Sequence, residues 1–469
     1  MKPSSFAQSS RFLRPRGLLL LGIASLASAL ALSGRSLAAD DPADQLVPIV
    51  INLITDKDKD LRALGLQQVR EQAKGAAATK RFAALLSELA PDVQAALLGA
   101  LADRGDAAAR PAVLEMLKSS DGRVRAAAIH AMGPLGATED TALLIHSLAG
   151  AAGPEKAAAR DSLVRLSGDP VSQAIAAALA QVPPATRAEL IAILATRRAT
   201  IALPSLLVAA EDPDSGVRTA AMAALAELAG PDQVAGMVKG VLKAKAGAER
   251  DAAERAVMTV CFRIDDPNKR AEPLLAAMAK LTPDENTPLL STLGRVGGTA
   301  ALKIVNAAIA DENPRRHAAG IRALCNWPDA TVAAQIEGMV PPARDPDERT
   351  QLVRALIRVA ALHDKRTDAE RLAVLKRAMT LATTDEERNL VVKRCRTIRT
   401  VESLRYLVPY LEQPPFAQEA CASVVELAHH KEVRVPNEAE FDRALDTVIR
   451  IGKDPDVVDH AQRYKKGET

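Results

Sequence analysis

The sequence predicts an all-α fold, an α-solenoid in which about twelve two-helix repeats of about 31 residues stack on one another. A motif at 119–137, SSDGRVRAAAIHAMGPLGA, returns at 212–230 as DPDSGVRTAAMAALAELAG. An apolar position also recurs at the repeat spacing, at Leu117, Leu148, Leu179 and Ala210. Aromatic residues make up only 2% of the 469 residues, so the core relies on Ala, Leu and Val. A unit of this length cannot bury its apolar stripe alone, so copies of it stack.

Residues 1–38 are predicted to form a secretory signal peptide. Basic residues between Arg11 and Arg16 precede an apolar run at 17–32, and the small residues Ser36 and Ala38 mark a cleavage site. The run is shorter than a typical membrane span of about 20 residues, although an uncleaved anchor is the alternative. We therefore expect an exported protein, either of the periplasm or cell envelope or secreted, that meets the membrane only transiently during export.

The charge balance argues against a nucleic-acid partner. The whole chain has a formal net charge of +3, but the leader holds five of its 61 basic residues and none of its 58 acidic ones. The rest of the chain therefore carries 56 basic and 58 acidic side chains. Nucleic-acid-binding proteins are usually basic overall or carry a basic stripe, so we expect no nucleic-acid partner.

Each repeat contains two amphipathic helical patterns. In the first helix, Val217, Ala221 and Leu225 share one side. In the second helix, the apolar residues fall at i, i+3, i+4, i+7 and i+8, at Val234, Met237, Val238, Val241 and Leu242. Gly and Pro separate the helices, as at 230–231. No period-2 alternation persists, so we expect no strands.

The first helix of a repeat begins with an acidic residue followed four positions later by arginine. Asp121 and Asp214 occupy the N-cap or the first turn, where a carboxylate meets free N–H groups and the helix dipole. Arg125 and Arg218 are expected to reach back to that Asp or across to its counterpart in the next repeat. Less regular copies of this start are Asp58 with Arg62 and Asn313 with His317.

These motifs resemble the HEAT repeat family, including its lyase-type HEAT-like members. Residues 212–242 resemble the family pattern in full, and residues 119–148 nearly so. The resemblance implies an α-solenoid with first helices on the convex face and second helices on a concave, ligand-binding face. The expected organisation is a signal peptide at 1–38, regular HEAT-type repeats at 43–345, divergent repeats at 346–452, and a C-terminal cap with a solvated tail at 453–469.

No set of residues forms a recognisable catalytic, cofactor-binding or metal-binding motif. The cysteines are Cys261, Cys325, Cys395 and Cys421, and their spacing matches no zinc or haem motif. All four fall in predicted first helices, so we expect buried thiols. Only Cys395 and Cys421 lie in neighbouring repeats, so only they could form a disulfide. The adjacent pair His429 and His430 points in directions about 100° apart on a helix and is a poor metal site.

Two further stretches have an ordinary structural interpretation. Gly294, Gly297 and Gly298 weakly resemble a phosphate-binding loop, but no strand precedes them, so a helix–helix joint is the better interpretation. The basic segment 388–400 is either the solvated side of a first helix or a site for an acidic partner or an anionic membrane surface. We therefore expect no enzyme, no cofactor and no metal.

The expected function is a non-catalytic interaction scaffold that binds an unidentified protein partner on the concave face. A lyase-type HEAT-like enzyme or accessory factor is one alternative, since some members of that group attach pigments to partner proteins. A structural module of an envelope assembly is the other. The absence of a Cys, His or acid cluster in the sequence favours the scaffold.

The candidate partner-binding residues lie in the divergent repeats. At 401–412 the apolar stripe is Leu404, Leu407, Val408 and Leu411. Tyr406 and Tyr410 then point away from the stripe, with Arg405 at one flank. The preceding second helix is expected to present Arg371 and Arg377 outside its own stripe. Tyr and Arg are enriched in interface hot spots, although Pro409 could instead turn the rings inward.

Overall fold

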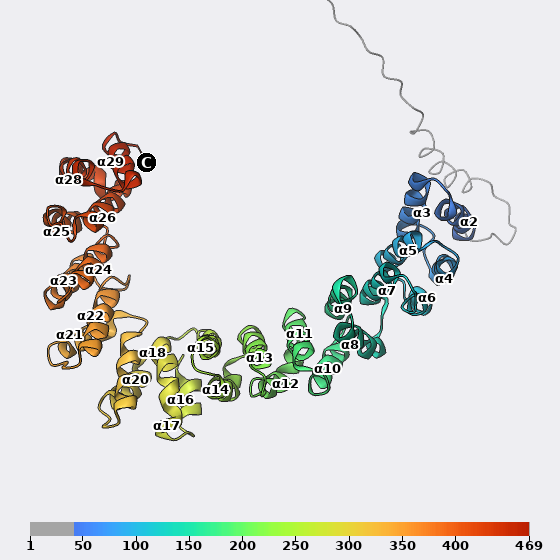
Figure 1. The fold of residues 1–469 in the computed structure, drawn as a ribbon, viewed down its shortest axis with the longest axis horizontal. Helices are drawn as coiled ribbons and strands as arrows, with labels where there is room; N and C mark the ends of the chain where they lie inside the picture. Colours follow the sequence, from blue (N-terminus) through green and yellow to red (C-terminus); the bar gives the residue numbers. More distant parts are fainter. Residues whose placement is uncertain (1–41, 469) are drawn as a thin grey trace, which may run out of the picture. The chain divides into compact units, whose positions relative to one another are not determined.

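The computed structural model describes residues 42–468, and the predicted signal peptide, residues 1–38, lies outside the described residues. Over residues 42–468 the secondary structure consists of α-helices and short 3-10 helices, with no strand, which confirms the all-α prediction. The chain forms two compact units, of which unit 1 ends at Thr186 and unit 2 begins at Arg187 (Figure 1). The boundary falls inside α11 (Pro184–Thr196).

The helices of each unit alternate between two rows, which we call the first row and the second row after the predicted first and second helices. In unit 1 the first row contains α3 (Lys59–Glu71), α5 (Pro91–Arg104), α7 (Gly122–Leu135) and α9 (Gly153–Arg165). Its second row contains α2 (Pro42–Thr55), α4 (Ala76–Ala84), α6 (Arg110–Met116), α8 (Thr141–Gly150) and α10 (Asp169–Ala178).

Unit 2 continues the same alternation. Its first row contains α13 (Ser215–Leu228), α15 (Ala248–Cys261), α17 (Pro283–Asn286) with α18 (Leu290–Val296), α20 (Pro314–Cys325), α22 (Pro346–Ala360), α24 (Asp385–Cys395), α26 (Ala417–His429) and α29 (Pro455–Lys465). Its second row contains α12 (Leu203–Ala209), α14 (Val234–Lys243), α16 (Glu272–Met278), α19 (Thr299–Ile309), α21 (Ala333–Met339), α23 (Asp368–Leu381), α25 (Val401–Leu411) and α27 (Lys431–Arg434) with α28 (Glu438–Ile451).

Short 3-10 helices extend or join several of these elements. They are η2 (Leu85–Ser87), η3 (Ala107–Ala109), η4 (Thr138–Asp140), η5 (Leu179–Gln181), η6 (Thr200–Ala202), η7 (Pro231–Gln233), η8 (Thr287–Leu289), η9 (Ala330–Val332) and η10 (Val435–Asn437). Several supply the first turn of a second-row helix, where the tighter spiral is common.

Helix α11, which spans the unit boundary, pairs with α12. Together with the other first-row helices, each paired with the second-row helix that follows it, this gives twelve repeats between residues 42 and 468, from α3–α4 to α26–α28, as predicted. Helix α2 precedes them and α29 follows them. The region from 453 on was expected to be a capping turn and a solvated tail, but it contains the full helix α29. This helix packs on α26 and α28 and buries Ala461 and Tyr464. It closes the apolar end that an unpaired last repeat would expose.

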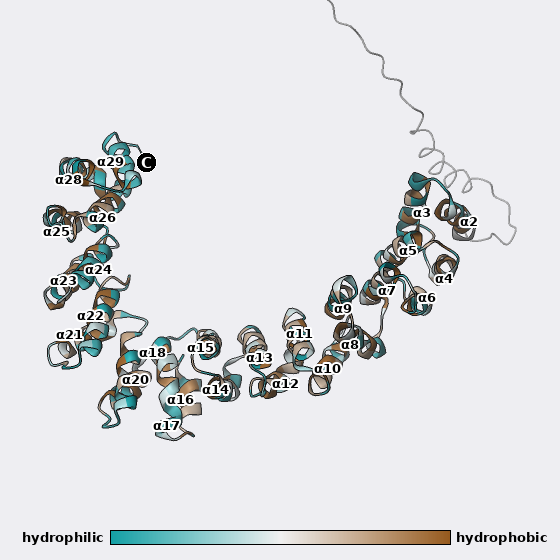
Figure 2. Cartoon of the chain, in the orientation of Figure 1, coloured by the Kyte–Doolittle hydropathy of each residue, from teal (hydrophilic) through white to brown (hydrophobic). Residues whose placement is uncertain are grey.

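Hydrophobic residues occur along the whole stack of each unit rather than in one central core (Figure 2). None of the helices in the described part of the chain is both long enough and apolar enough to span a bilayer. First-row neighbours approach closely where residues are small. A Cβ on Gly294 of α18 would lie 2.6 Å from the Cα atom of Ala323 in α20. The 294–298 segment is therefore a helix joint, as predicted.

The two first-row helices with the clearest motif, α7 and α13, are capped as expected, whereas α5, α9, α15 and α26 begin without a side-chain cap. Asp121 accepts a hydrogen bond from the backbone N–H of Arg123 at 2.8 Å, and Asp214 accepts one from Val217 at 3.0 Å. Each carboxylate therefore satisfies one of the free N–H groups of its helix. These caps mark where α7 and α13 begin.

Arg218 connects two repeats. Its Nη1 donates to the carbonyls of Asp212 and Pro213 at 2.8 and 2.9 Å, in the loop before its own helix. Its Nε donates to Glu249 Oε1 at 2.7 Å, in the first turn of the next first-row helix, α15. Arg125 makes the same contacts in unit 1, to the carbonyls of residues 119 and 120 and to Glu155. We call this arrangement the arginine bracket. The arginine reaches the next repeat, as predicted, but its partner there is a first-turn Glu.

The bracket continues past residue 345 in altered form, although the Val-Arg pattern stops there. Asp345 caps α22 by accepting from Asp347 N at 2.8 Å. Four residues later, Arg349 Nη2 donates to the carbonyl of Leu381 at 2.6 Å, at the end of α23 in the same repeat, and its Nη1 donates to Thr383 Oγ1 at 3.2 Å, in the loop before α24. His317 takes the same place in α20, with its Nε2 3.2 Å from Glu348 Oε2.

Within unit 2 the stack bends, and Figure 1 shows α13, α15, α22, α24 and α26 on the inner side of the bend. The family resemblance implied that second helices line the concave face, and for unit 2 that assignment is wrong. Small residues let neighbouring first-row helices approach closely, and the more closely spaced row of a curved stack lies on its inner side. Surfaces of the first row are therefore the inner surfaces of unit 2.

Replacing a core residue of α13 should destabilise unit 2 locally. Val217 and Leu225 are both 0% exposed, so either one changed to Ala should lower the free energy of unfolding by about 2–4 kcal/mol. In a stack the loss is felt mainly by neighbouring repeats, so amide hydrogen exchange should accelerate in α12 to α15 and not in unit 1. Thr219→Ala, an exposed change on the same helix, is the control. Equal acceleration throughout the chain would contradict the stacked architecture.

Candidate partner-binding surfaces

Tyr406 and Tyr410 line a groove between α23 and α25 with a volume of about 420 Å³. The two rings are edge-to-face with centroids 5.4 Å apart, and the Tyr410 hydroxyl donates to the Tyr406 hydroxyl at 3.2 Å. Lys376 Nζ lies 5.3 Å from the Tyr406 centroid, in cation–π range. Burial and the hydrogen bond to Tyr410 raise the pKa of Tyr406, so this phenol stays neutral. Both rings are half-buried in the groove wall rather than in the core.

The rest of α25 differs in one respect from the prediction. Pro409 does not end the helix, which runs to Leu411. Val408, expected in the apolar stripe, is 40% exposed; the buried side is narrower and consists of Ser403, Leu404, Leu407 and Leu411. Arg405 is exposed at the groove, as expected, but its guanidinium donates to both oxygens of Glu440 in α28 at 2.8 and 2.7 Å.

The structure does not bring Arg371 or Arg377 to the tyrosine groove. Arg371 is only 5% exposed and forms an ion pair with Asp368, so its predicted position on the outer surface is wrong. Its side chain enters a separate pocket at the ends of α22 and α24. Arg377 is exposed, as predicted, and its Nε donates to Glu337 Oε1 in α21 at 2.7 Å.

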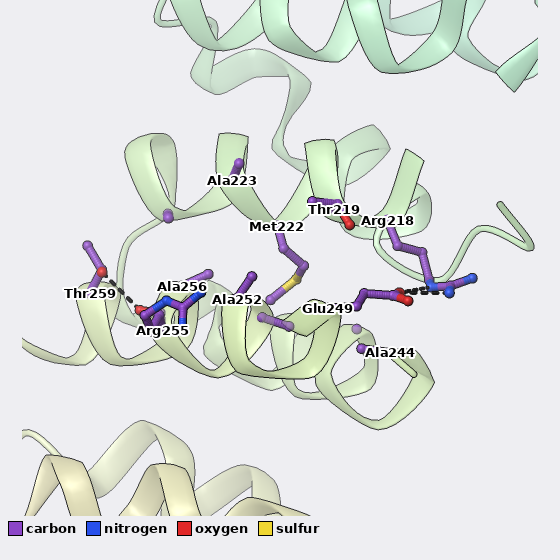
Figure 3. A pocket seen from close by; sticks show the side chains of 13 residues that line it. Arg218, Thr219, Met222, Ala223, Ala244, Glu249, Ala252, Arg255, Ala256 and Thr259 are labelled. Carbon is purple, nitrogen blue, oxygen red and sulfur yellow. Dashed lines mark hydrogen bonds and ion pairs between the residues drawn. The ribbon is translucent and has the colours of Figure 1, made fainter. Parts of the chain in front are cut away.

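A shallow groove of about 200 Å³ lies between α13 and α15 on the first-row side of unit 2 (Figure 3). Its walls are small side chains, namely Thr219, Ala223 and Ala226 of α13 and Ala252, Ala256 and Thr259 of α15. Met222 projects between the two helices. A Cβ on Gly240 of α14 would come within 2.8 Å of the Met222 sulfur, so the missing side chain leaves room for it. The Arg218–Glu249 pair stands at one end.

A wider cleft of about 600 Å³ lies on the other side of α15, toward α18 and α20. Glu254, 4% exposed, accepts a hydrogen bond from Ser291 Oγ at 2.5 Å and lies 3.5 Å from Arg295 Nη1. Burial nevertheless raises the pKa of the Glu254 carboxyl. The basic residues that line this cleft are Arg250, Arg315 and Arg322. The cleft thus combines basic side chains with one buried acid.

Sequence reasoning did not find this groove or this cleft. A signal exists: small residues recur one turn apart outside the apolar stripe of consecutive first helices, at Ala223 and Ala226 and then at Ala252 and Ala256. From the sequence, these alanines indicated only that neighbouring helices pack closely, and not that a groove lies between them. The burial of Glu254 depends on α18, which belongs to the next repeat along the chain. The residues around Glu254 in the sequence therefore do not predict that it is buried.

The chemistry of the cysteines and histidines is structural. All four cysteines are free thiols, and Cys395 and Cys421, the pair that could have formed a disulfide, are not bridged. Burial raises the pKa of Cys261, Cys325 and Cys395 to about 12 and that of Cys421 to about 11, so these thiols stay protonated and are poor nucleophiles. His429 Nδ1 lies 2.9 Å from the Tyr464 hydroxyl. Between residues 42 and 468 no three His, Cys, Asp or Glu side chains are grouped to hold a metal.

Comparison with known proteins agrees with the division of the chain into two-helix repeats. Residues 78–164, which lie within the α4–α9 region of unit 1, match the family model of HEAT repeats. This chain contains HEAT repeats. The matched HEAT repeats include the arginine bracket between Arg125 and Glu155, and the predicted resemblance is confirmed. No curated protein sequence matches the chain.

Solved structures with the same HEAT-type architecture include Kap121p bound to Pho4p, with a TM-score of 0.52 and 13% identity over 94% of this chain and 55% of that one. The karyopherin Kap121p bound to the extreme C-terminus of the protein phosphatase Cdc14p gives a TM-score of 0.52 and 13% identity, over 96% of this chain and 57% of that one. At this identity the similarity is one of fold alone. The chain spans a little over half the length of these structures.

The tyrosine groove gives a direct test of partner binding. Changing Tyr406 and Tyr410 together to Ala should weaken binding of a partner captured by in-cell cross-linking by about tenfold or more, because both rings and both hydroxyl groups are lost. Cooperative unfolding and far-UV circular dichroism should be retained, since the rings are half-buried. Val408→Ala on the same helix is the matched control. Unchanged affinity, or loss of cooperative unfolding, would show that the rings are not a contact surface.

Proposed function

We propose that this chain is an exported, non-catalytic scaffold that binds an extended segment of another protein on the inner, first-row face of unit 2. The observation that carries the proposal is the alanine-walled groove between α13 and α15 together with the cleft beyond α15. Both open on the same row and share one helix as a wall. A polypeptide segment that crosses α15 would therefore contact first the groove and then the cleft.

The size of the groove favours a polypeptide over a small molecule. Pockets for small ligands usually enclose about 300–1,000 Å³ and bury most of the ligand, whereas this groove offers about 200 Å³. That space suits one or two projecting side chains of an extended segment. Thr219 and Thr259 add hydroxyl groups along its walls, so the segment could form hydrogen bonds while its side chains lie on alanine.

The charges of the wider cleft favour acidic residues in the part of the segment beyond α15. Arg315 and Arg322 are exposed about two turns apart on α20, and neither forms a side-chain ion pair within residues 42–468. Glu254 is buried in the same cleft and lies 3.5 Å from Arg295 Nη1, so its own negative charge is offset by that arginine. Complementary charge of this kind guides association and sets register more than it adds affinity.

The tyrosine groove is proposed as a second contact surface, on the second row. Tyr406 and Tyr410 supply it, and Arg405 lies at its edge with Lys376. The Kap121p structures hold protein segments such as the Cdc14p C-terminus. That property belongs to Kap121p, and it supports the proposal by showing that this fold class accommodates bound segments.

Export is the second part of the proposal, and it rests on the leader pattern at 1–38. Expression of the full chain in a bacterial host should give a product in the envelope fraction whose N-terminus begins at Ala39. N-terminal sequencing and intact mass measurement check this. Ser36→Leu with Ala38→Leu, which places large residues at the cleavage site, should leave the leader attached. A full-length, cytosolic wild-type product would contradict export.

Site-specific photo-cross-linking tests the groove. A photoreactive amino acid at Ala223 or Ala252, which lie on opposite walls, should cross-link to the same partner protein in intact cells. The same amino acid at the exposed Ala300 of the second-row helix α19 is the matched control and should not. With the purified partner, Ala252→Trp should fill the groove and weaken binding by about tenfold or more. Equal capture at all three positions, or undiminished binding by the Trp variant, would exclude the groove.

A further inference from the structure

A pocket of about 550 Å³ opens in unit 2 where the ends of α22 and α24 meet the first turn of α23. Three arginines line it, namely Arg371, Arg396 and Arg399. Two acidic side chains, Asp368 and Glu426, also line it. The pocket lies apart from both grooves described above, and basic residues outnumber acidic ones along its walls.

Arg371 is buried in this pocket with an unsatisfied donor. The residue is 5% exposed, and one terminal nitrogen is paired with Asp368. Its Nε is fully buried and has no hydrogen-bond partner within the described residues. Buried polar groups in proteins are nearly always hydrogen-bonded, because an unmade bond to a charged donor is costly. Because this Nε is shut off from solvent, an acceptor oxygen in the pocket would satisfy it only after the Arg371 side chain shifts toward the pocket.

The other two arginines differ in their availability to a ligand. Arg396 forms an ion pair with Glu419, with its Nη1 3.7 Å from Oε1. Arg399 is exposed and has no ion pair among residues 42–468. Burial and the nearby positive charge of Arg399 lower the pKa of His430.

We propose that this pocket binds a carboxylate group, with Arg371 and Arg399 as the principal donors. The planar guanidinium group matches the two oxygens of a carboxylate. Arg371 and Arg396 already have acidic partners, so the ligand carboxylate would meet Arg399 and the unsatisfied donor of Arg371. A doubly charged phosphate would meet Asp368 and Glu426 with more repulsion. The carboxylate can belong to a small free acid or to an acidic side chain of a bound protein.

Isothermal titration calorimetry on the full chain at constant ionic strength tests the proposal. The probes are succinate, a capped Gly-Glu-Gly peptide and inorganic phosphate. We expect at least one carboxylate probe to bind more tightly than phosphate. Binding of succinate alone identifies a free acid as the source, and binding of the peptide identifies a protein side chain. Phosphate binding as tight as either carboxylate, or binding of neither carboxylate, would overturn the proposal.

Arginine variants then test which side chains donate hydrogen bonds to the bound carboxylate. Arg399→Gln should weaken carboxylate binding by about tenfold, because one charge-assisted hydrogen bond is lost. Since Arg399 is exposed, this change leaves the fold intact, whereas Arg371→Gln tests the buried donor and is interpreted only if the variant unfolds cooperatively. Arg377→Gln, on the same helix α23 but outside the pocket, is the matched control and should bind as the wild type does. Equal affinity of the Arg399→Gln variant and the wild type would refute the assignment. None of these measurements depends on the groove between α13 and α15.

Discussion

The stack depends on the arginine bracket, in which one side chain joins the loop before its own helix to the first turn of the next first-row helix. Arg218 is 4% exposed and meets two loop carbonyls and the Glu249 carboxylate at 2.7 to 2.9 Å. A desolvated charge is tolerated only when such partners surround it. The bracket therefore holds neighbouring repeats at one distance and in one register. Arg125 repeats it in unit 1 through Glu155.

A second group of arginines acts at the opposite end of the first-row helices. Arg104, Arg263 and Arg358 follow or end a first-row helix and donate to carbonyls at the end of the preceding one. For example, Arg358 Nη2 donates to the carbonyl of Trp327 at 2.6 Å. These carbonyls lack partners within their own helices, so a cation from the next repeat satisfies them. Arginines thus join neighbouring first-row helices at both helix ends, and alanine side chains fill the space between the helices. That leaves shallow grooves rather than deep cavities.

The candidate surfaces were predictable to different degrees. Tyr406 and Tyr410 were identified because residues four apart share one side of a helix, and the structure places their rings together. The same reasoning failed for Arg371, whose long side chain enters a pocket formed by its own repeat together with the two repeats that follow. Helical periodicity gives the direction of the Cα–Cβ bond. The far end of a long, flexible side chain can point elsewhere, because its charged group moves toward an oppositely charged partner.

The sequence by itself determined the helices, their caps, the repeat length and the buried stripe, because each depends on residues within about one turn or one repeat. It also indicated buried cysteines, which holds for Cys261, Cys395 and Cys421, whereas Cys325 is half-buried. The tertiary structure alone decided which row lies inside the bend of unit 2, that Glu254 is buried against Ser291, and that the Nε of Arg371 has no partner. These outcomes depend on how residues of different repeats are brought together, where stacking geometry rather than local periodicity sets the distance between side chains.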